Sequence, residues 1–168
     1  MKTTTQPLLK RQLNGRLKQI QTQVQQIDAV IAGTIAQDEV LSDKLDILVS
    51  IPGIAEATVW AMIIEMPELG TLDGKQAASL AGLAPISRQS GKWQGKERIQ
   101  GGPAFLRRAI YMPALVAVRF NPGLKAKYGQ LIKVGKPVKL ALTAIIRKLV
   151  VMANALLRDC RKWSQVQP

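Results

Sequence analysis

The chain has 168 residues, a net charge of +13 and an apolar fraction of 47%, so it can form a packed core and is not a disordered tail. It has no histidine and one cysteine, Cys160, which excludes Ser-His catalysis, His-ligated metals, an internal disulfide and a thiolate zinc site. No uninterrupted apolar run approaches the ~20 residues of a membrane span, and the first residues are polar. We therefore expect a cytoplasmic protein without a membrane partner.

The positive charge is concentrated in the second half of the chain. Residues 1–87 contain 7 Lys/Arg and 9 Asp/Glu, whereas residues 88–168 contain 17 Lys/Arg and 2 Asp/Glu, a balance of +15. Such a segment is typical of a surface that binds the phosphates of DNA or RNA. A merely solvated basic face is the alternative.

The first predicted element is a long amphipathic helix. Gly33 and Thr34 interrupt its pattern, and a second helix follows. Residues 1–47 then form either a helical hairpin packed on its own domain or a coiled-coil arm that joins two chains. The apolar residues of the first helix recur at steps of four and three, a heptad pattern, at Leu13, Leu17, Ile20, Val24, Ile27 and Ile31.

A turn at Pro52-Gly53, between two apolar segments, predicts an element similar to a helix-hairpin-helix. Gly53 permits a tight turn between two helices. Amides at Gly53, Ile54 and the start of the next helix can then hold a DNA phosphate. A plain interhelical turn is the alternative.

The least regular part of the sequence, residues 84–103, is predicted to be a long Gly-rich basic loop. A loop of this length is uncommon in a compact domain unless it is functional. Ser90 is the candidate nucleophile and Ser87 its rival. From the residues alone, a serine in a basic Gly-rich loop with no histidine to activate it is more typical of a phosphate ligand than of a nucleophile. The candidate phosphate-binding cations of this loop are Arg88, Lys92, Lys96 and Arg98.

Helices are predicted for the rest of the chain, over residues 104–118, 124–133 and 138–162. Arg107 and Arg108 follow Gly-Gly-Pro at a helix start, a position that suits phosphate or RNA-backbone binding, with helix-surface charge as the alternative. The last helix is expected to be buried through residues that include Leu140 and Ile145. Strand signal is thin, so the predicted fold is mainly α, with an arm over 1–47 and a compact helical domain over 48–168.

Five short motifs follow one another in the second part of the chain. They are Ile51-Pro52-Gly53-Ile54, Leu80-Ala81-Gly82-Leu83-Ala84-Pro85, Gln89-Ser90-Gly91-Lys92, Arg98-Ile99-Gln100-Gly101-Gly102 and Leu106-Arg107-Arg108. Their order resembles the C-terminal domain of insertion-sequence transposases that pair a RuvC-like DEDD domain with a serine-bearing domain, a family to which the pilin-gene invertase is related. The resemblance covers residues 48–159, and Gln100-Gly101-Gly102 lacks one basic residue that the family usually has there.

This resemblance implies DNA transposition or site-specific recombination through a covalent intermediate between DNA and a serine, here Ser90. It also implies a structured guide RNA, a homo-oligomer or a DEDD-domain partner, and Mg²⁺ held by the acids of that domain. The acids of this chain lie on predicted helices and form no such set, so no metal or cofactor is expected in it.

We therefore expect a truncated frame or one piece of a split gene, inactive as an enzyme by itself. A non-catalytic DNA- or RNA-binding module and a truncated regulator of a full-length transposase are the alternatives.

Overall fold

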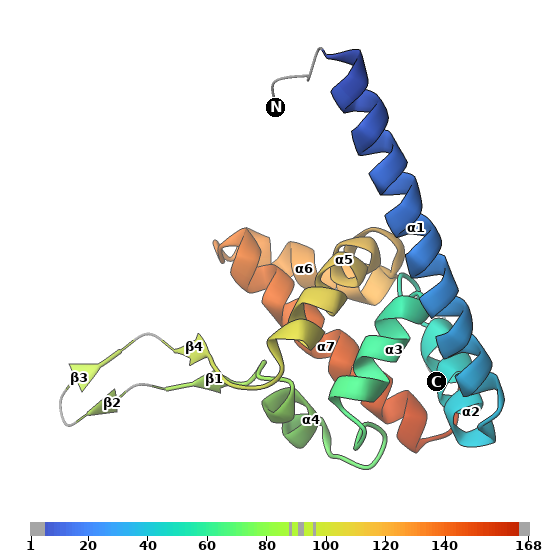
Figure 1. Ribbon diagram of the computed structural model, residues 1–168. Helices are drawn as coiled ribbons and strands as arrows, with labels where there is room; N and C mark the ends of the chain where they lie inside the picture. Colours follow the sequence, from blue (N-terminus) through green and yellow to red (C-terminus); the bar gives the residue numbers. More distant parts are fainter. Residues whose placement is uncertain (1–5, 88, 91–92, 96, 165–168) are drawn as a thin grey trace. The chain divides into compact units, whose positions relative to one another are not determined.

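The computed structural model describes residues 6–87, 89–90, 93–95 and 97–164, and for Ser90, Trp93 and Gln94 it describes the backbone alone. The described part is mainly α-helical, as predicted (Figure 1). The chain divides into two compact units, residues 1–43 and 44–168, so the division falls inside helix α2 (Glu39–Val49).

The first unit is dominated by the single long helix α1 (Pro7–Ala36), with a proline in its first turn. The helix continues through Gly33 and Thr34, where a break was predicted. One glycine costs a helix only about 1 kcal/mol, and the Thr34 hydroxyl donates to the Val30 carbonyl at 2.9 Å. The heptad side chains of this helix, from Leu13 to Ile27, are exposed.

The second unit is a cluster of helices built around α7 (Val138–Arg158). Helix α7 packs against α4 (Gly74–Leu80), α5 (Ala104–Phe120) and α6 (Pro122–Lys133), and α3 (Glu56–Glu65) packs against α5. By length and composition α7 is also the one helix of the described residues that could cross a membrane, but ten of its residues are buried in this unit.

Side-chain hydrogen bonds fix the start of α4 and the loop that precedes it. Asp73 accepts hydrogen bonds from the amides of Lys75 and Gln76 in a capping box that begins α4. Asn154, buried in α7, accepts from the Gly70 amide at 2.9 Å and donates to the Leu72 carbonyl at 2.6 Å, which holds the loop between α3 and α4 against α7.

The buried face of α7 differs from the prediction at its start. Leu140 is 49% exposed, whereas Leu142 is 3% exposed and lies in the core with Ile145. The sequence pattern alone did not place the first turn, because apolar residues occupy both faces of the helix there.

The segment predicted to be an irregular loop contains short antiparallel strands. Strand β1 (Pro85–Ile86) pairs with β4 (Arg98–Ile99), and β2 (Gln89–Ser90) pairs with β3 (Trp93–Gln94). We call residues 85–99 the ribbon. Each strand has two residues and both members of the β1–β4 pair are exposed, so no apolar alternation marked them in the sequence.

Candidate nucleic-acid interface

Two glycines bring the ends of the ribbon together. Gly82 precedes β1 with φ +66°, and Gly102 follows β4 with φ +62°. A Cβ on Gly102 would lie 2.5 Å from the Ala81 carbonyl carbon, and a Cβ on Gly82 would overlap the Gly101 carbonyl oxygen. Only glycine allows the two backbones to approach this closely. We call Ala81, Gly82, Gly101 and Gly102 the ribbon root.

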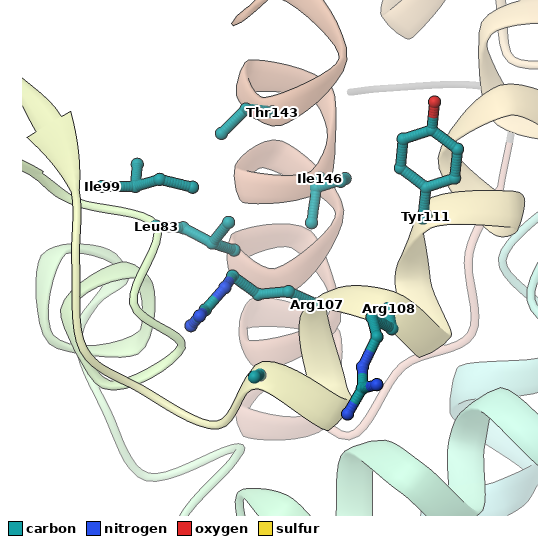
Figure 2. Close-up of a pocket in the computed structure, with 8 residues that line it drawn as sticks. Leu83, Ile99, Arg107, Arg108, Tyr111, Thr143 and Ile146 are labelled. Carbon is teal, nitrogen blue, oxygen red and sulfur yellow. The ribbon is translucent and has the colours of Figure 1, made fainter. Parts of the chain in front are cut away.

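Arg107 joins the two sides of the root. One guanidinium nitrogen, Nη1, donates to the Ala81 carbonyl at 3.3 Å and to the Gly101 carbonyl. The side chain is half-buried, whereas Arg108 is exposed. Figure 2 shows the two guanidinium groups pointing in different directions. Arg107 thus holds the ribbon on α5, and Arg108 is the member of the pair that faces solvent.

A hollow of about 340 Å³ lies beside the root, between α5, α7 and β4. Leu83, Ile99 and Ile146 give it apolar walls. Figure 2 shows Leu83 and Ile99 on one side, Ile146 on α7 and Tyr111 on the other side. Its polar lining comes from Arg107, Arg108, Tyr111 and Thr143.

The ribbon gathers several of the residues predicted from the sequence. Ser90 lies in β2, with its backbone in register with Trp93. Ser87 is exposed between β1 and β2, and Arg98 is exposed in β4, in register with Ile86. Arg88, Lys92 and Lys96 lie outside the described residues.

The predicted helix-hairpin-helix-like turn is present but is closely packed. Gly53 has φ +92°, and a Cβ there would lie 3.0 Å from Val116 Cβ on α5. Ile54 is 5% exposed and belongs to the core, and its amide donates to the Ile51 carbonyl at 3.0 Å. The side chain of Ile54 therefore faces the protein interior, and the N-cap residue of α3, Ala55, makes no side-chain hydrogen bond to the helix amides.

The turn and the ribbon root contact the same helix. Gly53 meets α5 at Val116, and the root meets it at Arg107. At 1.5 Å per residue these positions are about 13 Å apart along the axis of α5. Helix α5 therefore positions both predicted nucleic-acid elements.

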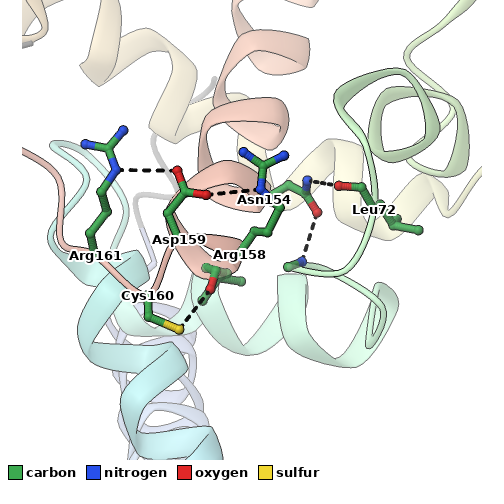
Figure 3. A network of polar contacts seen from close by, with 8 residues as sticks. Leu72, Asn154, Arg158, Asp159, Cys160 and Arg161 are labelled. Atoms are coloured by element: carbon green, nitrogen blue, oxygen red, sulfur yellow. Dashed lines mark hydrogen bonds and ion pairs between the residues drawn. The ribbon is translucent and has the colours of Figure 1, made fainter. Parts of the chain in front are cut away.

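Most cations of the basic half have no acidic partner in the described part of the chain. The ion pairs there are Arg158–Asp159 at 3.0 Å, Arg161–Asp159 at 3.6 Å and Lys162–Asp46 at 3.0 Å (Figure 3 shows the first two). They use only cations at the end of α7 and after it. The exposed cations left for phosphates include Arg98, Arg108, Arg119, Lys125, Lys133, Lys136 and Lys139.

The acidic residues do not gather. Among the described residues no group of three or more His, Cys, Asp or Glu side chains could hold a metal ion. The carboxylates of this part of the chain therefore do not fit a two-metal nuclease centre.

The sequence profile of the IS116/IS110/IS902 transposase family matches residues 45–129, which lie in the second unit and include α3, the ribbon and α5. The chain belongs to this transposase family. The profile covers the turn at Gly53, Ser90 and Arg107, and it leaves out α1 and α7.

Curated relatives agree with this membership. The pilin gene-inverting protein of Moraxella bovis is 31% identical over 147 residues, which are 84% of this chain and 45% of that protein. The protein of insertion element IS110 from Streptomyces coelicolor is 30% identical over 67% of this chain and 28% of its own length. The protein of insertion element IS900 from Mycobacterium paratuberculosis is 31% identical over 68% of this chain and 29% of its own length. The chain spans less than half the length of these relatives.

Sequence reasoning missed three residues of the ribbon root and the hollow. Gly82 was part of a recognised motif but had no role, because its backbone contact is with Gly102, far along the chain. Tyr111 stands four residues after Arg107, so helical spacing could have placed both on one face of α5. Thr143 comes from α7, and no signal in the sequence connects it with this site.

Proposed function

We propose that this chain is the C-terminal, serine-bearing part of a transposase that carries out DNA transposition or site-specific recombination. Family membership supports the proposal, as does the relative whose name describes inversion of a pilin gene. The structural observation that carries it is the ribbon. Ser90 lies on an extension rooted by Gly82, Gly102 and Arg107, and the same ribbon carries exposed Arg98 on β4, which has no acidic partner among the described residues.

In the proposed reaction the hydroxyl of Ser90 attacks a DNA phosphodiester. A bond forms between Oγ and phosphorus, the bond from phosphorus to one sugar oxygen breaks, and that oxygen leaves with a proton. A hydroxyl of a second strand then attacks the same phosphorus and releases the serine, so the energy of the phosphodiester is retained. Arg98 supports this role, because an exposed cation on the ribbon can stabilise the charge that develops on the phosphate.

The proposed assembly contains more than this chain. The chain has no histidine, and its described residues contain no acid cluster, so neither of these supplies activation of the serine. We assign activation to a DEDD-domain partner, which would also hold Mg²⁺. DNA and a structured guide RNA are the proposed nucleic-acid partners, and the cytoplasm is the proposed location.

We also propose self-association through α1. Its heptad residues are exposed along the helix, with Ile20 46% and Ile27 60% exposed. An uncovered apolar seam of this kind is typical of a helix that pairs with another copy.

Salt-dependent binding tests whether the basic half contacts phosphates. If about six phosphates are neutralised, affinity for duplex DNA or structured RNA should fall about 10³-fold between roughly 50 and 200 mM salt. Fluorescence anisotropy across a salt series measures this slope. A flat series, or no binding at low salt, would contradict a phosphate-binding role.

The nucleophile is tested in an assembly reconstituted with the DEDD partner. Ser90→Ala should abolish the covalent protein–DNA adduct and strand transfer while DNA binding is retained, and mass spectrometry of the wild type should place the adduct on the peptide that contains Ser90. Ser87→Ala is the matched control and should keep both activities. An adduct on Ser87, or full transfer by Ser90→Ala, would return Ser90 to the role of a phosphate ligand.

The exposed seam of α1 favours one further candidate function. A chain that joins full-length transposase copies through this helix, without reacting with DNA itself, would be a regulator. In the same reconstituted assembly such a chain would lower strand transfer by the full-length protein and form no adduct.

A further inference from the structure

We propose that the hollow between α5, α7 and β4 binds one unpaired nucleobase, with the adjoining phosphate on Arg108. The inference rests on the proposed function and adds to it a defined base-binding site. Ile99 of β4 lines the hollow, and the same ribbon carries the proposed nucleophile in its outer strand pair, β2 and β3 (Figure 1). The hollow would therefore hold the nucleic acid at the base of the ribbon that carries Ser90.

The size and lining of the hollow match a flat, mostly apolar ligand with polar edges. Its volume of about 340 Å³ lies at the lower end of the ~300–1,000 Å³ of small-ligand sites. Leu83, Ile99 and Ile146 provide the apolar walls. Leu83 lies in the segment between Gly82 and β1, Ile99 lies in β4 and Ile146 lies in α7, so the hollow exists only where the ribbon meets the helices.

Tyr111 provides the aromatic surface on which a base can stack. Its side chain is 43% exposed, and its ring stands at the side of the hollow opposite Leu83 and Ile99 (Figure 2). A base stacked on such a ring contributes strongly to binding and with little sequence preference. A base inside a duplex has both faces covered by its neighbours, so the ligand must be unpaired.

Charge selects a nucleotide over an uncharged flat ligand. Arg108 lines the hollow, is exposed, and takes part in no ion pair of the described residues. Lys139 is exposed one turn before Thr143 on α7, where its carbonyl accepts the Thr143 hydroxyl at 2.9 Å. Cations therefore stand near the hollow on two different helices, in positions suited to the phosphates on either side of a base.

The test compares the affinity of the chain for two probes that differ only in whether one unpaired base is present. The probes are a DNA duplex with a single unpaired adenosine, the same duplex with an abasic site there, and the corresponding pair made of RNA. For the intact chain we expect about tenfold tighter binding of the probe that keeps the base, in the DNA pair, the RNA pair or both. The pair with the larger ratio identifies the source of the base.

Variants of the lining residues test whether the ratio of affinities, base-containing probe over abasic probe, depends on the hollow. Tyr111→Ala should reduce the ratio to near one, whereas Tyr111→Phe should keep it because the ring remains. Thr143→Trp fills the hollow and should also remove the ratio. Arg108→Ala should weaken binding of the base-containing and the abasic probe alike. Met112→Ala is the control, exposed on the same helix but outside the hollow, and it should leave the affinity for both probes unchanged.

The outcomes separate this inference from the proposed function. Salt-sensitive binding with equal affinity for base and abasic probes would overturn the hollow alone, as would a ratio that survives both Tyr111→Ala and Thr143→Trp in folded variants. Absence of nucleic-acid binding altogether would overturn the proposed function and this site with it.

Discussion

The two arginines at the start of α5 have different environments, although they are neighbours in the sequence. Arg107 donates to two backbone carbonyls of the ribbon root, and Arg108 is exposed. Helical geometry explains the difference, because consecutive residues project about 100° apart around the axis. Both were predicted to be phosphate ligands, because contact with the root depends on tertiary packing and leaves no local pattern in the sequence.

We predict that substitution of Arg107 mainly lowers stability, whereas substitution of Arg108 mainly weakens DNA binding. Arg107→Ala should lower the free energy of unfolding by about 1.5–3 kcal/mol, since hydrogen bonds from a charged donor are lost and two carbonyls lose a partner. Arg108→Ala should change stability by less than about 0.5 kcal/mol and weaken DNA binding. Urea denaturation and anisotropy measure the two effects, and equal stability of the two variants would contradict the contact of Arg107 with the root.

Adjacent glycines allow a second test at this scale. Gly101 and Gly102 both have positive φ, +76° and +62°, but a Cβ on Gly101 meets nothing within 4 Å, whereas one on Gly102 meets the backbone of Ala81 and Gly82. Gly101→Ala should therefore cost only the backbone strain, about 1 kcal/mol. Gly102→Ala should cost at least about 1 kcal/mol more, measured by chemical denaturation. Equal costs would mean that the two backbones do not touch.

At the scale of elements, α1 has a heptad pattern that is visible in the sequence but is not buried by any contact among the described residues of the single chain. Its heptad period is visible in the sequence, and the structure leaves those side chains exposed. The ribbon is the opposite case. Its strands leave no periodic signal, because their pairing depends on how the root brings residues 85–86 and 98–99 together.

We predict that charges placed in the α1 seam will dissociate the oligomer. Ile20→Lys with Ile27→Lys should convert a dimer or larger assembly to a monomer with unchanged helix content, because a coiled-coil seam excludes like charges while an exposed helix face tolerates them. Gln25→Lys with Gln26→Lys, exposed and outside the seam, is the matched control. Sedimentation velocity decides the question, and a monomeric wild-type chain would remove the dimerisation role of α1.

At the scale of the whole molecule, charge and acid placement determine what the chain can do alone. Its basic half carries a balance of +15, and its described acids form no metal-binding group. This charge distribution is typical of a surface that binds phosphates.

We predict that the purified 168-residue chain will bind DNA without cutting it. Incubated with supercoiled plasmid and Mg²⁺, it should leave the plasmid uncut on an agarose gel, because neither a histidine base nor a carboxylate set is available. Addition of a full-length relative provides the positive control. Nicking by the chain alone that disappears in Ser90→Ala would show that its own residues suffice for the first chemical step.

The sequence by itself determined the properties that depend on composition and local order. The mainly helical fold, the tight turn at Gly53, the basic second half and the transposase motifs were all predicted from it, since helix periodicity, glycine conformation and charge need no distant partner. The tertiary structure decided the rest. The contact of Gly82 with Gly102, the hydrogen bond from Arg107 to Ala81 and the hollow lined by Tyr111 and Thr143 join residues that are 20, 26 and 32 positions apart. Backbone proximity and side-chain direction set such contacts, and the chain acquires both only when its helices pack.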